Sequence, residues 1–151
     1  MNHYDPEKAA RVWQRVRSGS SEETAPELLT LIGDELAEAA LCQKLSRLFN
    51  RQQNALLRQI TQEDRSHAAC LQGIYTLLTG SRPKPLIPSI PRTSPDIHLR
   101  RCYGRKLLAA ARYEAKANDP EYGTVFSRLA LQERTHCRLI LELLGSIPAK
   151  E

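Results

Sequence analysis

Two short segments of the chain carry a carboxylate and an imidazole at the same spacing. His67 follows Asp64 by three residues, and His136 follows Glu133 by three residues. Residues three apart on a helix lie side by side on one face, so each pair would present two metal-ligating groups together. Oxygen and nitrogen ligands of this kind suit iron, manganese or zinc. The two pairs therefore predict a metal site if the elements that carry them face each other.

Each pair interrupts an apolar pattern that is typical of a buried helix face. Residues at alternating steps of three and four are apolar from Leu57 to Leu78 and, around the second pair, from Tyr122 to Leu143. This spacing predicts two helices with heptad-type apolar stripes, which are polar only at the two pairs. A buried carboxylate and imidazole without partners would cost several kcal/mol, so a cation or another compensating group is expected beside them.

Local signals divide the chain into helices, and no strand pattern is found. Asp5 as the N-cap and Pro6 in the first turn predict a short helix that ends near Val16, with Trp13 pinning it to the bundle or to a second subunit. Four long helices are expected over residues 24–49, 51–79, 96–117 and 119–145. Their boundaries follow from a capping box at Thr24–Glu27, a break at Asn50, a stop at Gly80 and a cap at Asp119.

The connections between these helices predict an all-α four-helix bundle. Residues 80–97 contain five prolines, which exclude a helix there and indicate an extended crossover. The other two connections are short. Residues 25–147 are therefore expected to form two antiparallel helix hairpins joined by the crossover, after an N-terminal helix and linker in residues 1–24. A weak internal repeat supports the pairing, because Gly33–Leu36 aligns with Gly104–Leu107 and Asp64–His67 aligns with Glu133–His136.

With these motifs, residues 25–147 resemble the ferritin-like superfamily, nearest to the rubrerythrin-type di-iron carboxylate proteins. The family places one Glu on each of the first and third helices and Glu-x-x-His on each of the second and fourth. The resemblance implies iron or manganese in the bundle core and an oxidoreductase or peroxidase that reacts with dioxygen or peroxide. It implies these metal ligands: Glu35, Asp64, His67, Glu133 and His136.

Three positions depart from the family pattern. Asp64 is one methylene shorter than the expected Glu, Cys42 stands where a Tyr often follows the first Glu, and Lys106 stands where the second Glu belongs. The spacing of Lys106 in its helix directs its ammonium to the same centre, where nearby carboxylates keep it charged and where it would repel a metal ion. Tyr113 and Tyr103 are candidates for hydrogen-bond donors to the ligands or for redox neighbours, and core packing is the alternative role for both and for Cys42.

The lysine leaves a second interpretation open. In it the metal site is degenerate, and Lys106 forms an ion cluster with the carboxylates. The bundle then has no cofactor and is a structural or dimeric interaction module. Glu38 and Glu114 are expected at the surface rather than among the ligands. Glu63 lies off the apolar stripe but is a candidate to compensate for the short side chain of Asp64.

Composition excludes several other classes of function. The net charge of +5 is spread along 151 residues and only 5% of them are aromatic, which does not favour nucleic-acid binding. No segment is apolar enough for a membrane span and the N-terminus lacks a secretory signal, so a cytoplasmic protein is expected. The four cysteines form no C-x-x-C pair, which excludes a rubredoxin-like relay, so peroxide reduction would need an external electron donor. By analogy with the family, a homodimer is expected.

Overall fold

The computed structural model describes residues 5–11 and 20–147 and contains no strand within them. A helical segment over residues 6–11 begins after Asp5, whose carboxylate accepts hydrogen bonds from the backbone N–H groups of Glu7 (3.0 Å) and Lys8 (3.2 Å). This confirms the predicted cap, whereas the contacts predicted for Trp13 lie outside the described residues. None of the described helices is both long enough and apolar enough to cross a membrane.

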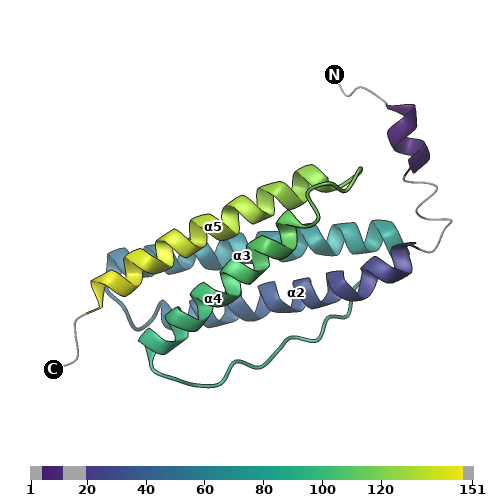
Figure 1. Cartoon of the computed structure of the whole chain (residues 1–151). Coiled ribbons are helices and arrows are strands. Elements are labelled where there is room, and N and C mark those ends of the chain that lie inside the picture. The colour runs from purple at the N-terminus through teal and green to yellow at the C-terminus, as the bar shows by residue number, and fades with distance from the viewer. Residues whose placement is uncertain (1–4, 12–19, 148–151) are drawn as a thin grey trace.

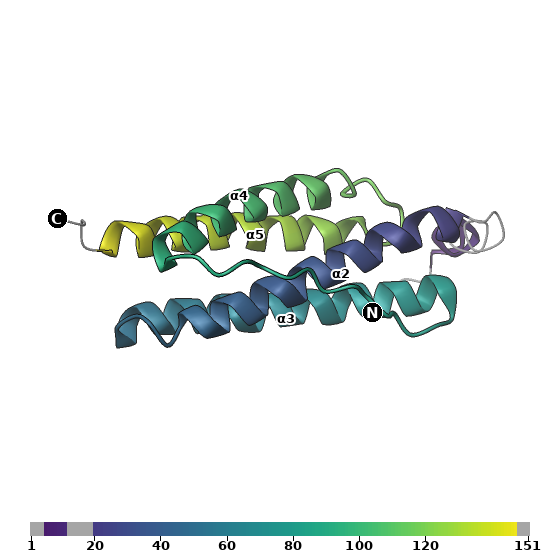
Figure 2. The same cartoon turned by 90° about the horizontal axis from the view of Figure 1, so that it is seen from below.

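Four long helices form the body of the molecule. They are α2 (Ser20–Leu45), α3 (Arg51–Thr79), α4 (Pro95–Glu114) and α5 (Gly123–Ser146). α2 packs along α3 and α4 packs along α5, so the bundle has two layers of one hairpin each (Figure 1, Figure 2). The all-α architecture of two antiparallel hairpins is therefore confirmed. The extended crossover from α3 to α4 runs back along the side of the bundle where α2 and α4 face each other (Figure 2).

α3 has the bounds that the sequence predicts, because both of its ends are capped locally. At its start, the Asn50 side chain accepts a hydrogen bond from the Gln53 N–H (2.9 Å), and the Gln53 side chain accepts one from the Asn50 N–H (3.1 Å). At its end, Gly80 takes the left-handed conformation (φ 72°) and its N–H donates to the carbonyl of Thr76. These caps fix the register of the first carboxylate and imidazole pair.

α2 differs from the prediction at both ends. It begins at Ser20, so the capping box predicted at Thr24–Glu27 does not start the helix. Pro26 lies in the second turn, where it removes one backbone hydrogen bond close to the end of a long helix. α2 ends at Leu45 rather than near residue 49, and a short turn leads on to α3.

The second hairpin also has shifted ends. α4 ends at Glu114, three residues before the predicted position, and turns follow it. α5 begins at Gly123 instead of residue 119. The reason is that the Asp119 carboxylate accepts hydrogen bonds from the N–H groups of Glu121 (2.9 Å) and Tyr122 (2.8 Å) and so closes a turn before the helix.

Two apolar layers fill the bundle on either side of its middle. One layer is built around Leu28, Leu71, Phe126 and Leu129, and the other around Leu57, Ile60, Leu99 and Ile140. All the stripe residues predicted for α3 are buried, whereas Tyr122, at the start of the stripe predicted for α5, is half-buried. The polar residues of the stripes lie between the two layers, so apolar side chains separate them from both ends of the bundle.

The crossover lies directly on α2 at a glycine. The carbonyl group of Leu86 occupies the space that a Cβ atom of Gly33 would fill, and the ring of Pro88 lies beside it. The absence of a side chain at Gly33 therefore lets the extended segment pack against the helix backbone. This contact places residues 88–91 over the space between α2 and α4 (Figure 2).

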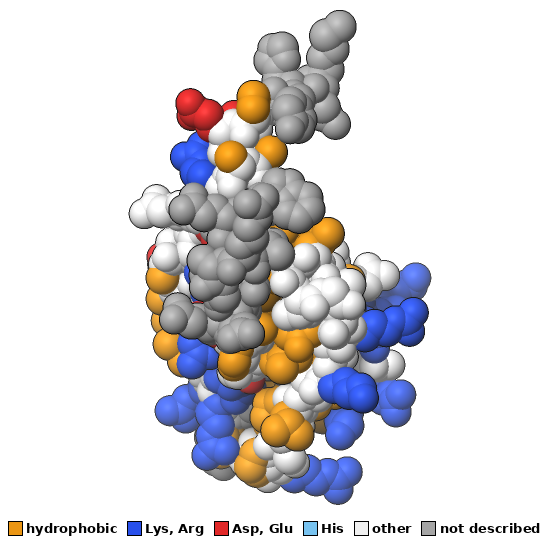
Figure 3. Space-filling view, turned by 90° about the vertical axis from the view of Figure 1, so that its right-hand side faces the viewer, with side chains coloured by type: hydrophobic (Ala, Val, Ile, Leu, Met, Phe, Trp, Pro, Cys, Tyr) orange, Lys and Arg blue, Asp and Glu red, His pale blue; other side chains and the backbone are white. Residues whose placement is uncertain are grey.

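Basic side chains do not gather into one patch on the end of the molecule that Figure 3 shows. Lys and Arg side chains lie along both edges of this face, and hydrophobic and uncharged side chains lie between them. On this face the positive charge is therefore dispersed.

Replacing Gly33 by alanine is expected to destabilise the protein by roughly 1 kcal/mol or more, because overpacking against the Leu86 carbonyl displaces the crossover. The matched change at Gly104 is expected to stabilise it by about 0.5–1 kcal/mol, because an added Cβ atom there meets nothing within 4 Å and alanine favours the helix. Denaturant unfolding of the two variants measures both changes. Equal changes of the same sign would contradict the close packing of the crossover on α2.

Candidate metal centre

The five residues that the sequence singles out as metal ligands come together in the middle of the bundle. They are Glu35 from α2, Asp64 and His67 from α3, and Glu133 and His136 from α5, and each is at most 4% exposed. Four of them, Glu35, Asp64, His67 and Glu133, each offer one ligand atom, and these atoms all lie within 4.8 Å of one another. The convergence arises because each residue stands on the inward stripe of its helix.

His67 occupies one half of this centre and faces acceptors on both sides of its ring. Its Nδ1 lies 3.1 Å from Glu133 Oε1 and 3.4 Å from Glu35 Oε1. Its Nε2 lies 2.5 Å from the side-chain oxygen of Gln132. Because all three partners are oxygens that accept, both ring nitrogens carry a proton in this arrangement. The Gln132 contact holds Nε2–H and leaves Nδ1 directed at the carboxylates.

His136 occupies the other half and is related to His67 by the internal repeat. Its Nε2 lies 2.6 Å from Glu63 Oε2, and its Nδ1 lies 3.0 Å from Lys106 Nζ. An ammonium only donates, so Nδ1 is the acceptor and Nε2–H donates to Glu63. The two imidazole rings stack with centroids 5.7 Å apart. Each histidine therefore bonds to a residue of the partner helix that directly precedes the acid of that helix's own pair: His67 to Gln132, before Glu133, and His136 to Glu63, before Asp64.

Lys106 lies on α4 with its ammonium inside the cluster, and its side chain is 2% exposed. Besides His136, its Nζ bonds to Asp64 Oδ1 and lies 3.1 Å from Glu133 Oε2. Burial alone would lower the pKa of this lysine, but the carboxylates of Asp64, Glu133 and Glu35 raise it well above its usual value. The ammonium therefore stays charged, as the sequence predicts.

Tyr113 completes the half of the centre that contains His67. Its hydroxyl donates to Glu35 Oε1 at 2.7 Å, and burial together with the Glu35 carboxylate raises the pKa of the phenol, so the proton stays on the tyrosine. This places Tyr113 as the donor that orients Glu35.

Tyr103 was the other candidate for a hydrogen-bond donor to the ligands or for a redox neighbour, but it is half-buried and packs against one of the apolar layers.

The charges in the cluster balance when two protons are bound. Burial raises the pKa of Glu35 well above its usual value, and the neighbouring Glu133 adds to this effect. Burial alone would lower the pKa of His67, but its hydrogen bonds with Glu133 and Glu35 raise it to about 10. Lys106 holds the pKa of Glu133 low even though burial opposes this. With Glu35 neutral and His67 protonated, the carboxylates of Asp64 and Glu133 face two positive charges.

The donor set fits one metal ion. Glu35 Oε2 and Asp64 Oδ2 are buried and have no hydrogen-bond partner, and Glu133 Oε2 meets Lys106 only as an ion pair without hydrogen-bond geometry. Buried acceptors are normally satisfied, so these oxygens are available to bind a proton or a cation. The carboxylates of these three residues and the imidazole of His67 form an oxygen and nitrogen set that suits a transition metal such as iron, manganese or zinc.

Two acidic residues lie in positions that the sequence did not predict. Glu38 was expected at the surface but is buried, because it bonds to the Arg105 guanidinium and accepts a hydrogen bond from the Cys102 thiol at 3.1 Å. It stands three residues after Glu35, and this helical spacing could have placed it on the same face. Glu63 lies off the apolar stripe, as expected, but its hydrogen bond with His136 was not predicted.

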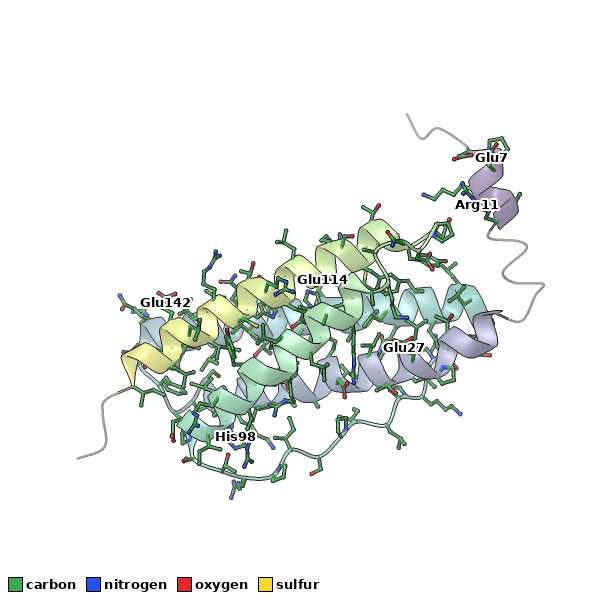
Figure 4. The ribbon with its side chains drawn as sticks, viewed as in Figure 1. Glu7, Arg11, Glu27, His98, Glu114 and Glu142 are labelled. Atoms are coloured by element: carbon green, nitrogen blue, oxygen red, sulfur yellow. The ribbon has the colours of Figure 1, made fainter. Side chains whose placement is uncertain are left out.

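Glu114 behaves as predicted. It lies on α4 (Figure 4), where it is exposed and pairs with Arg134 of α5 at 2.5 Å.

Gln132 had no signal in the sequence beyond its place next to Glu133. Its role depends on the direction of an amide side chain, which helical periodicity does not determine.

The chain matches no protein-family model, and it has no significant match among curated proteins or solved structures. The description of this centre therefore rests on the residues of the chain and on their geometry.

The stability of the metal-free protein is expected to fall as the pH rises from about 6.5 to about 10. The pKa of His67 is about 10 in the folded state against 6.5 without its partners. Its protonation therefore stabilises the fold fully below pH 6.5, and this stabilisation is lost as the pH rises through 10. Denaturant unfolding across this range should show a loss of roughly 2 kcal/mol or more that is absent in His67→Gln. A parallel pH dependence in both proteins would contradict the assignment of this loss to His67.

Proposed function

We propose that the protein binds one iron or manganese ion in the bundle core and is a ferritin-like, rubrerythrin-related oxidoreductase that acts on dioxygen or peroxide. The observation that carries the proposal is the convergence of Glu35, Asp64, Glu133 and His67 within 4.8 Å, where each of the three carboxylates has a buried oxygen without a hydrogen-bond partner. The proposed ligands are Glu35, Asp64, His67 and Glu133. The family resemblance supports the reaction class, since Glu35 and the two carboxylate and imidazole pairs follow its motif.

Lys106 supports a centre with one ion rather than two. Its ammonium contacts Asp64, Glu133 and His136. A second metal ion, placed as the internal repeat would place it, would bind to these same three side chains. The ammonium thus holds the second cation position, and its charge is permanent at neutral pH. For this reason His136 belongs to the lysine half of the centre and is not among the proposed ligands.

The chain prepares the site for chemistry at an ion in several ways. A bound iron or manganese ion would supply electron exchange with the oxidant. Tyr113 orients Glu35, and Gln132 holds Nε2–H of His67 so that Nδ1, once it releases its proton, is the ligand atom. Lys106 and Tyr113 hold protons at Nζ and Oη next to the carboxylates. The apolar layers exclude water from the two ends of the bundle, and electrons come from an external donor.

One observation favours a second candidate function. The ammonium of Lys106 and the protonated His67 can balance the carboxylates without any ion, as the contacts above show. In that case the buried cluster is a structural element of a bundle that serves as a scaffold or a homodimeric module. Metal content distinguishes the two candidates.

The protein is expected to retain about one iron or manganese ion per chain after loading and gel filtration. His67→Ala should lower its metal affinity by roughly tenfold or more, because a ligand is lost. His136→Ala is the matched variant and should keep the metal within a few-fold, because its ring bonds to Lys106 and Glu63 instead. Elemental analysis and a metal titration measure both effects. An unmodified protein without metal would reject this function and favour the metal-free candidate.

Lys106→Glu is expected to raise the metal content to about two ions per chain, because it removes the ammonium and restores a carboxylate at the second cation position. Lys44→Glu makes the same change of charge on the exposed surface of α2 and controls for the overall charge of the protein. Elemental analysis of both variants, loaded in parallel, provides the measurement. The same metal content in Lys106→Glu and Lys44→Glu would show that the lysine does not occupy a metal position.

A further inference from the structure

A cavity of about 350 Å³ is lined by α2, α4 and the crossover. Figure 2 shows the crossover running along the side where these two helices face each other. Its walls are mostly apolar. They consist of Leu31 and Ala37 from α2, Leu108 and Ala109 from α4, and Pro88, Ile90 and Pro91 from the crossover. Pockets of this volume with apolar walls and a few polar groups are typical of sites for small organic molecules.

The floor of the cavity is the proposed metal centre. Glu35, Lys106, Tyr113 and Glu133 all line it. Glu35 is 4% exposed, and its Oε2 is buried without a hydrogen-bond partner. Dioxygen or peroxide would fill only a small part of the cavity, since a water molecule takes about 30 Å³ in the liquid. The space therefore accommodates a larger molecule, one end of which would meet the centre.

The mouth of the cavity carries a guanidinium with donors to spare. Arg112 lines it and, among the described residues 5–11 and 20–147, makes one hydrogen bond, at 3.4 Å, from Nη1 to Asp34 Oδ2. Both side chains are more than 40% exposed. Arg105, which also lines the cavity, is held by Glu38 through both Nε and Nη2. An arginine has five N–H donors, so Arg112 can bind a carboxylate through two of them.

We propose that this cavity binds a small organic monocarboxylate with an apolar body of roughly ten non-hydrogen atoms. The carboxylate bonds to Arg112 at the mouth, the apolar body packs between Leu31 and Leu108, and its far end lies at Glu35 and Lys106. This names the substrate class of the proposed oxidoreductase and rests on that function for the chemistry at the far end. Binding itself needs only the cavity and Arg112.

Calorimetric titration of the full chain with octanoate, octan-1-ol and octylamine tests the proposal, with and without bound metal. Octanoate should bind about tenfold more tightly than octan-1-ol because of a charge-assisted hydrogen bond, and octylamine should bind most weakly. Arg112→Gln should bring octanoate to the level of octan-1-ol. Arg101→Gln, an exposed position on α4 outside the cavity, should leave the difference unchanged.

A second pair of variants tests the location. Ala109→Phe fills the cavity and should weaken octanoate binding by roughly tenfold or more. Ala111→Phe, on the exposed side of the same helix, should not. If Ala109→Phe does not fold, Ala37→Leu fills the cavity from α2. The metal content should stay unchanged in all of these variants, because none of them alters a proposed ligand.

Each outcome has one meaning. Octan-1-ol or octylamine binding as tightly as octanoate would overturn the proposal, and so would unchanged octanoate binding in a folded cavity-filling variant. Octanoate binding with the expected pattern in a protein that takes up no metal would reject the proposed function but keep the carboxylate site. Normal metal content without octanoate binding would reject the carboxylate site alone.

Discussion

The constraint on which the rest of this structure depends is the burial of three carboxylates at one point. Glu35, Asp64 and Glu133 are at most 4% exposed and come from three different helices. Negative charges in an apolar core are tolerated only with cations beside them. Lys106 supplies one cation permanently, and His67 supplies another that a metal ion can replace. The apolar layers on both sides strengthen these interactions, because they keep water away from the two ends of the bundle.

The internal repeat explains the arrangement of the centre, and the departures from the repeat explain its chemistry. Asp64 and Glu133, with their histidines, are equivalent in the two hairpins. In the repeat, Lys106 takes the position that is equivalent to Glu35, and Glu63 takes the position that is equivalent to Gln132. The neutral amide of Gln132 leaves Nδ1 of His67 directed at the carboxylates of Glu35 and Glu133. In the other hairpin, the acid Glu63 and the ammonium of Lys106 engage both ring nitrogens of His136. A two-fold related scaffold therefore carries one half that suits a metal ion and one half that already contains a cation.

Helical periodicity predicted the fold and the inward residues well, because both follow from which face of each helix is apolar. It placed Lys106 and the five candidate ligands at one centre, and the local caps of α3 gave that helix its bounds. Periodicity failed where the reach of a side chain decides the contact. Glu38, Glu63 and Gln132 stand beside the stripes, and their long side chains bend to partners on other helices. The start of α2 was missed because a proline usually marks a first turn, whereas Pro26 lies in the second turn, where it removes one backbone hydrogen bond.

Charge balance also limits which ion the core can hold. Three carboxylates and one permanent ammonium leave a net charge of −2, provided that His67 is neutral and Glu35 is ionised. A divalent ion cancels this charge, since it takes the place of the two protons that the metal-free cluster holds on Glu35 and His67. A monovalent ion would leave the buried centre negative, which an apolar environment disfavours. Without Lys106 the same carboxylates would call for three positive charges. In the proposed metal-bound state, Lys106 therefore leaves a charge that one divalent ion balances, where the carboxylates alone would call for more than one ion.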